Sequence, residues 1–257
     1  SNFSYAISNG VLPPGLSLDN STGDVVGSPL TAGSFSFDVI VTDSLFATAS
    51  VSVTINVNNR LAIDTAGVPT TADVGFLFNG TVSASGGTKP YTFSVSLGAL
   101  PADLTLDPLS GQITGVPAAA TEATFILEVT DALLSKDGKM VVLVVAEPLL
   151  IDISGVPSSA DVGLAFSGNV TAAGGTVPYA FSVSEGALPD GLTLDSETGA
   201  ISGSPNATGL FSVTFVVSDL LSVTSSASKS IVISPASTES TTESTTESTT
   251  ESTTEST

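Results

Sequence analysis

The chain of 257 residues contains no cysteine, histidine or tryptophan. It therefore lacks thiolate nucleophiles, the imidazole that most often serves as a general base, and every soft metal ligand. Disulfide bonds are excluded as well, so cysteine usage does not indicate a cellular compartment. We expect no catalytic site, and any metal bound by this chain would have to accept oxygen ligands.

Basic residues are also scarce, because five Lys and Arg stand against 25 Asp and Glu, for a net charge of −20. This charge repels nucleic acid phosphates and anionic lipid, which excludes both as expected partners. The longest apolar run, Met140 to Ala146, is far shorter than the roughly 20 residues that span a bilayer. We therefore expect no membrane insertion by these residues.

The sequence repeats itself at an interval of 88 residues. Residues 86–117 return with few changes as residues 174–205, and the second half of the same pattern opens the chain. A period of this length predicts an array of small domains. The expected parts are repeats at 1–59, 60–148 and 149–235, followed by a low-complexity segment at 236–257.

The first copy is expected to be incomplete. Its residues 16–19 align with residues 104–107, so the counterpart of residues 60–88 is absent. The chain thus begins within a repeat, and no export signal can be read from it. We expect residues 1–59 to expose an apolar patch and an open sheet edge.

Apolar residues alternate along each repeat, as in half-buried strands. Phe78, Gly80 and Val82 share one face of such a strand, and turns with Gly and Pro separate the strands at roughly ten-residue intervals. The pattern predicts an all-β chain of two-sheet antiparallel sandwiches. Period-two runs with the same meaning occur at Phe3/Tyr5/Ile7, Phe37/Val39/Val41, Val53/Ile55/Val57, Tyr91/Phe93/Val95, Phe125/Leu127/Val129 and Val141/Leu143/Val145.

The string from Ala187 to Pro205, ALPDGLTLDSETGAISGSP, is followed by an aromatic strand that ends in Val-Ser-Asp219. It resembles the putative-Ig repeats of bacterial and archaeal surface proteins, which are similar to cadherin and dystroglycan-type cadherin-like domains. The resemblance implies tandem Ig-like/cadherin-like sandwiches that act as spacers or adhesive units of extracellular proteins. Cadherin-like members often bind calcium between domains.

Asp107 and Asp195 begin turns that close on Gly111 and Gly199. We expect each carboxylate to accept from backbone N–H groups two or three residues on, while the glycine takes a positive φ.

The cadherin resemblance implies calcium ligands at the repeat junctions, and calcium prefers hard oxygen donors. Asp131 and Asp219 match a late-strand aspartate, and Asn56, Asn58 and Asn59 resemble a cadherin linker. The position of the cadherin paired aspartates, however, reads Ser-Gly-Gly and Ala-Gly-Gly. Solvated turn acids are the alternative interpretation, and a calcium site would be weak.

Residues 238–257 are five copies of Thr-Glu-Ser-Thr, a composition that cannot bury apolar surface. It resembles an O-glycosylated stalk, and a bare linker is the alternative.

The chain is thus expected to be a non-enzymatic extracellular or cell-surface array, a spacer or adhesion module that contacts neighbouring repeats, surface proteins or glycans. A calcium-binding cadherin-like module and a carbohydrate-binding accessory module of a secreted enzyme are the alternatives. Sugar sites usually stack on exposed aromatic residues, whereas the Phe and Tyr residues here mostly take inward positions.

Overall fold

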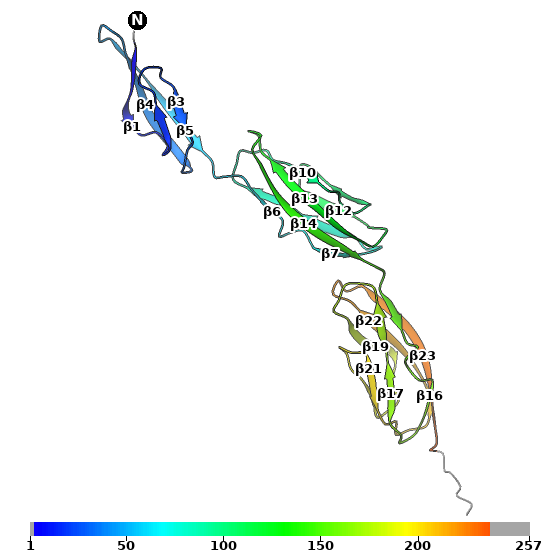
Figure 1. Ribbon diagram of the computed structural model, residues 1–257. Helices are drawn as coiled ribbons and strands as arrows, with labels where there is room; N and C mark the ends of the chain where they lie inside the picture. The colour runs from blue at the N-terminus through cyan, green and yellow to red at the C-terminus, as the bar shows by residue number, and fades with distance from the viewer. Residues whose placement is uncertain (1–2, 237–257) are drawn as a thin grey trace, which may run out of the picture. The chain divides into compact units, whose positions relative to one another are not determined.

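The computed structural model describes residues 3–236, and the Thr-Glu-Ser-Thr stalk predicted at 238–257 lies outside them. The described chain consists of strands β1 to β23, without a helix, as the sequence predicts (Figure 1). Accordingly, no helix between residues 3 and 236 is long and apolar enough to cross a membrane. The chain divides into two compact units between Pro148 and Leu149.

The second repeat lies in the first unit and forms a complete sandwich. One sheet has the order β10-β13-β14-β7, the other has the order β11-β12-β8, and β6 pairs with β9. Its core comes from both sheets and includes the fully buried Ile113, Phe125 and Leu143. The strands are β6 (Ala62–Asp64), β7 (Thr71–Asp73), β8 (Phe78–Thr81), β9 (Ser83–Ser85), β10 (Thr92–Leu97), β11 (Leu104–Leu106), β12 (Gln112–Gly115), β13 (Thr121–Thr130) and β14 (Lys136–Ala146).

The third repeat forms the second unit with the same topology. Its sheets have the orders β16-β23-β22-β19 and β17-β21-β20, with β15 paired to β18. Ile201, Phe215 and Ile231 are fully buried in its core. The strands are β15 (Leu150–Asp152), β16 (Ser159–Asp161), β17 (Phe166–Asn169), β18 (Thr171–Ala173), β19 (Ala180–Gly186), β20 (Leu192–Leu194), β21 (Ala200–Gly203), β22 (Gly209–Ser218) and β23 (Thr224–Ser234).

The first repeat contains fewer strands. Its sheets have the orders β1-β4-β5 and β2-β3. Phe37 is buried and inward residues such as Val39 and Ile55 are half-buried, but Val51 of β5, opposite Val39, and Val25 of β3 are exposed. The strands are β1 (Ser4–Gly10), β2 (Leu16–Leu18), β3 (Val25–Gly27), β4 (Gly33–Thr42) and β5 (Thr48–Val57).

Two features differ from the predicted antiparallel sandwich. First, β7 pairs in parallel with the end of β14, with Thr71 opposite Val144, and β16 does the same with β23. Second, the strand predicted to run through Phe78 and Val82 is divided. The ladder between β8 and β12 ends at Thr81, opposite Gln112, and the Val82 N–H donates to the adjoining Gly111 carbonyl at 2.9 Å. The chain then continues as β9, which pairs with β6. Alternation of side chains continues through this change of partner, which is why it is invisible in the sequence.

Candidate functional site

The hairpin between β13 and β14 is closed by the carboxylate of Asp131. Its Oδ1 accepts from the backbone N–H groups of Leu133 and Ser135, both at 2.9 Å. Leu134 between them takes a positive φ of 64°. The Asp131 side chain is buried, so these bonds replace the water that the carboxylate loses.

The second oxygen of Asp131 holds a different loop. Its Oδ2 accepts from the Thr88 N–H at 2.8 Å, and the Thr88 carbonyl accepts from the Ala132 N–H at 2.8 Å. Gly87 precedes Thr88 with a φ of 57°, and a Cβ added there would lie 2.7 Å from Asp131 Oδ2. Gly86 is fixed in turn, because its carbonyl accepts from the Tyr91 hydroxyl. Only glycine therefore fits at position 87 without displacing the carboxylate.

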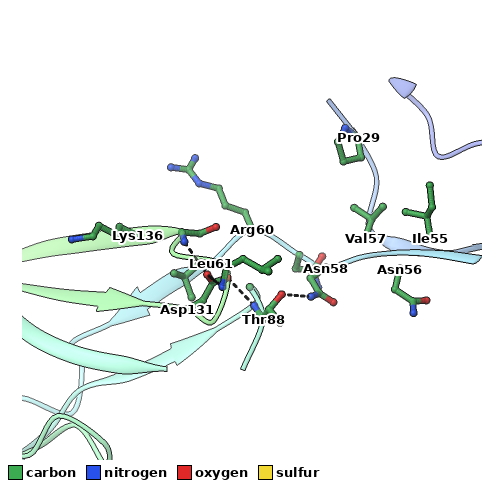
Figure 2. A pocket seen from close by; sticks show the side chains of 14 residues that line it. Pro29, Ile55, Asn56, Val57, Asn58, Arg60, Leu61, Thr88, Asp131 and Lys136 are labelled. Atoms are coloured by element: carbon green, nitrogen blue, oxygen red, sulfur yellow. Dashed lines mark hydrogen bonds between the residues drawn. The ribbon is translucent and has the colours of Figure 1, made fainter. Parts of the chain in front are cut away.

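The same loop binds the linker that enters the second repeat (Figure 2). The Gly87 N–H donates to the Asn59 carbonyl at 2.7 Å, and Asn58 Nδ2 donates to Thr88 Oγ1 at 2.8 Å. Leu61 then enters the core of the second repeat and is 4% exposed. We call Asn58, Asn59, Gly87, Thr88 and Asp131 the junction clamp, because together they fix the linker to the repeat that follows it.

Hydrogen bonding sets the charge state of the clamp. The Thr88 N–H, followed by those of Ser135 and Leu133, stabilises the ionised carboxylate and lowers the pKa of Asp131 from its ordinary value. The clamp is thus formed by the anion and weakens when that anion is protonated.

The second unit repeats the central part of this arrangement. Asp219 Oδ1 accepts from Leu221 and Val223, at 3.0 and 2.9 Å, and its Oδ2 accepts from Thr176 at 2.9 Å. The counterpart of Asn58 is Ala146, which has no side-chain donor.

In the first repeat, Asp43 accepts from Leu45 and Ala47, both at 2.8 Å. The described part of this repeat has no counterpart of Thr88, so Asp43 closes its hairpin without a third partner.

The structure brings together part of the predicted calcium set. Asn58, Asn59 and Asp131 meet at the Gly86–Thr88 loop, while Asn56 lines the same pocket but lies before them in the chain, still within β5 (Figure 2). Asp219 occupies the equivalent turn of the second unit.

These residues fit calcium poorly. Calcium takes six to eight oxygen ligands, yet Asp131 already accepts three backbone N–H groups and is the only carboxylate lining this pocket. The described residues contain no group of three or more acidic side chains placed to hold a metal. Calcium at Asn56, Asn58, Asn59, Asp131 and Asp219 stays a prediction, and the bonding of Asp131 favours the alternative of a turn acid.

Sequence reasoning missed the role of the glycine pair. In the sequence, Ser85-Gly86-Gly87 and Ala173-Gly174-Gly175 stand out only because they lack the paired aspartates of cadherins. The sequence Gly-Gly-Thr nevertheless recurs unchanged after 88 residues, each time three residues before a tyrosine, Tyr91 or Tyr179. This repetition is the signal that could have indicated a structural role for the loop.

The predicted turn caps are confirmed. Asp107 Oδ1 accepts from Leu109 and Ser110 at 2.8 and 2.9 Å, and Asp195 Oδ1 accepts from Glu197 and Thr198, both at 2.9 Å. These N–H groups, with Ser110 and Thr198 contributing most, lower the pKa of each carboxyl from its ordinary value.

Comparison with solved structures finds multi-domain proteins that resemble this chain. The three N-terminal domains of the bacteriophage RB49 Hoc protein match with a TM-score of 0.53 and 14% identity, over 92% of this chain and 89% of that one. Extracellular domains 3–5 of Drosophila OTK match with a TM-score of 0.47 and 10% identity, over 91% and 86%. Protocadherin gammaB7 EC3-6 matches with a TM-score of 0.33 and 15% identity, over 91% of this chain but only 65% of the length of that one. The Hoc match, with a TM-score above 0.5 but 14% identity, shows a similar fold alone.

No curated protein matches this chain. The family described as "Putative Ig domain" matches it three times, over residues 1–58, 62–146 and 148–234. These matches cover most of the sequence and coincide with the repeated pattern of strands. The chain therefore belongs to the putative Ig domain family.

Proposed function

We propose that this chain is a non-enzymatic spacer and adhesion array of an extracellular or cell-surface protein. The observation that carries the proposal is the junction clamp, in which the buried carboxylate of Asp131, the left-handed Gly87 and the side chain of Thr88 together fix a linker. An array that must hold its repeats at defined distances needs such linkers. Membership of an Ig-like repeat family, whose members are typically non-enzymatic, supports the same function.

The proposal is tested by measuring the width of the distribution of distances between the first two repeats. The chain has no cysteine, so Ser17→Cys in β2 and Ser94→Cys in β10 give specific sites for spin labels, and both positions are exposed. We expect a narrow distance distribution by pulsed electron paramagnetic resonance. Combining Asn58→Ala with Thr88→Ala should broaden it.

The matched control replaces residues 58–60 by Gly-Ser-Gly in the same doubly labelled chain. A parent distribution as broad as that of this control would mean that the linker has no fixed conformation, and the spacer function would be lost with it.

The same spin labels distinguish the calcium-binding alternative from the proposed function. Calcium at millimolar concentration, the range of weak extracellular modules, should narrow the distribution relative to chelator if the junction binds the ion. An unchanged distribution would remove that alternative. For the carbohydrate-binding alternative, and for an adhesive role toward glycans, the measurement is a glycan array with the full chain, in which a saturable signal identifies the ligand class.

A further inference from the structure

The outer face of the larger sheet in the second repeat carries a group of apolar side chains. Leu97 of β10 pairs with Ile126 of β13, and Ile126 pairs with Met140 of β14, so the three lie side by side across neighbouring strands. Leu97 and Met140 are 66% and 65% exposed, and Ile126 is half-buried. Val142 and Val144 follow Met140 on the same face of β14, because side chains alternate along a strand. We call these five residues the sheet-face patch.

The other two repeats are polar across the same three strands. In the first repeat the middle residue, Asp38, accepts hydrogen bonds from both of its neighbours. In the third repeat the hydroxyl of the middle residue, Thr214, lies 3.0 Å from that of its neighbour on β23. The equivalents of Leu97, Ile126 and Met140 are Asn9, Asp38 and Ser52 in the first repeat and Glu185, Thr214 and Ser228 in the third.

Folding of the second repeat does not account for the sheet-face patch. The core of this repeat lies on the opposite face of the same strands, where Phe125, Leu127 and Leu143 are at most 1% exposed. The first and third repeats form the same strand pairs with polar residues in these places. A contiguous exposed apolar patch on a chain with a net charge of −20 therefore marks an interaction surface.

Charged residues stand at the two ends of this face. Glu122 and Lys136 lie on opposite sides of the Ile126–Met140 pair, each four residues along its own strand. Lys136 forms an ion pair with Glu128 at 2.7 Å, and its side chain is still 60% exposed. A two-fold axis that crosses the strands at the Ile126–Met140 pair would thus bring Lys136 of one copy to the end that carries Glu122 in the other. The face is complementary to itself in this orientation.

We propose that the sheet-face patch binds the sheet-face patch of a second copy of this chain, about that two-fold axis. Flat outer faces of two sheets can pack with their apolar side chains interdigitated, and an isologous contact uses the same residues on both copies. The inference rests on the adhesion part of the proposed function and names its partner. It does not rest on the junction clamp.

The size of the patch sets the expected strength. An apolar patch on the order of 400 Å² per copy, with its polar surroundings, gives an interface near the lower limit of specific ones. Association of two isolated chains is therefore weak. Many copies displayed on one surface would reinforce it, because each further contact forms at a high effective concentration.

The test is sedimentation equilibrium of the full chain over a range of concentrations. The variant Leu97→Glu, Ile126→Thr, Met140→Ser places the residues of the third repeat on the second, so the fold already accommodates them at the equivalent positions. We expect the parent chain to dimerise and the variant to do so at least about tenfold more weakly, because apolar burial is lost. Leu109→Ser is the matched control, since Leu109 is 79% exposed in a turn of the same repeat and should not affect dimerisation.

A charge exchange tests the orientation. Lys136→Glu should weaken dimerisation several-fold, because it sets like charges against each other at both ends of the interface. Adding Glu122→Lys to that variant should restore it. A double variant as weak as Lys136→Glu alone would overturn the proposed axis.

Salt distinguishes an apolar contact from binding by charge. Two chains of net charge −20 repel each other, so raising the salt from about 0.05 to 0.5 M should strengthen dimerisation by screening that repulsion. Dimerisation that weakens with salt would overturn the apolar contact.

Three further results would overturn the proposal. They are a parent chain that stays monomeric up to about 1 mM, dimerisation that the triple variant leaves unchanged, and equal loss in the triple variant and in Leu109→Ser. Each of these leaves the distance distribution between the first two repeats of a single chain untouched, so the spacer function is judged separately.

Discussion

The hairpins β4–β5 and β13–β14 have the same strand pairing but differ in how far their inward side chains are buried. Each has a ten-residue ladder in the same register, with Phe37 opposite Val53 in one and Phe125 opposite Val141 in the other. Both turns are closed by an aspartate that accepts from backbone N–H groups two and four residues on. Within residues 3–236, the second of these two hairpins is covered by a segment distant in sequence and the first is not. The pair teaches that ladder and turn follow from local sequence, whereas burial depends on a partner about 60 residues away.

The largest expected difference between a covered and an uncovered hairpin is at one equivalent position that is isoleucine in the first and third repeats. Ile231 is 0% exposed and Ile55 is half-buried. Ile231→Ala should lower the free energy of unfolding of the third repeat by about 3 kcal/mol, and Ile55→Ala that of the first by about 1 kcal/mol, since less surface and cavity are lost. Urea denaturation followed by residue-resolved hydrogen exchange separates the repeats. Equal losses would contradict the difference in cover.

A second test removes the junction clamp from the covered hairpin. Gly87→Ala introduces both a strained φ and a Cβ within 2.7 Å of Asp131 Oδ2, and it should destabilise the second repeat by about 2 kcal/mol. Gly75→Ala is the matched control, because Gly75 has a φ of 85° but no atom within 4 Å of the added Cβ. The control should cost about 1 kcal/mol. If the two variants unfold at the same urea concentration, the contact with Asp131 contributes nothing.

A third test uses pH. The pKa of Asp131 is lower in the folded state than the ordinary value of 3.8, so its contribution is fully present above that value and is lost as pH falls through the folded pKa. The melting temperature of the second repeat should therefore fall by several degrees between pH 4 and pH 2. Asp131→Asn should begin lower and fall less steeply. Parallel curves for the two proteins would show that Asp131 is not a source of this pH dependence.

The smallest effect is expected at the linker itself. The bond between Asn58 and Thr88 joins neutral side chains at an exposed site, so its coupling in a double-mutant cycle of Asn58→Ala and Thr88→Ala should be about 0.5 kcal/mol. Ala146→Asn, at the equivalent position of the second junction, tests whether this donor can be added where it is lacking. A coupling of zero at the first junction would leave the backbone bond from Gly87 as the fixed point of the linker.

Much of this fold could be predicted because the same pattern of strands and turns recurs in each repeat. The alternation through Phe125, Leu127 and Val129 marks an inward face, and those three side chains are at most 1% exposed. Asp107 lies within reach of the N–H groups that it caps, so its role depends only on neighbouring residues. Local periodicity and local hydrogen bonds are legible in a single sequence.

The parts that could not be predicted join residues distant in the chain. The parallel pairing of β7 with β14 brings Thr71 beside Val144, and no local pattern encodes that choice. The sequence also does not reveal that Asp131 Oδ2 accepts a hydrogen bond from the N–H of Thr88, 43 residues earlier. The oxygen atoms of a carboxylate can coordinate a metal ion or accept hydrogen bonds from backbone N–H groups. Which backbone N–H groups lie within reach depends on the fold.

The parallel pairing also has a mechanical consequence. The chain enters the second repeat ahead of β7 and leaves it just after β14, and the two strands run in the same direction where they pair. Tension applied to the two ends therefore slides β7 along β14, so that the bonds from Val144 to Thr70 and from Val74 to Ala146 are strained together rather than one after another. The third repeat has the same pattern between β16 and β23, with bonds from Val232 to Ser158 and from Val162 to Ser234. Under a steady pull, we expect these two repeats to hold until a whole group of bonds fails at once, and the first repeat to yield earlier.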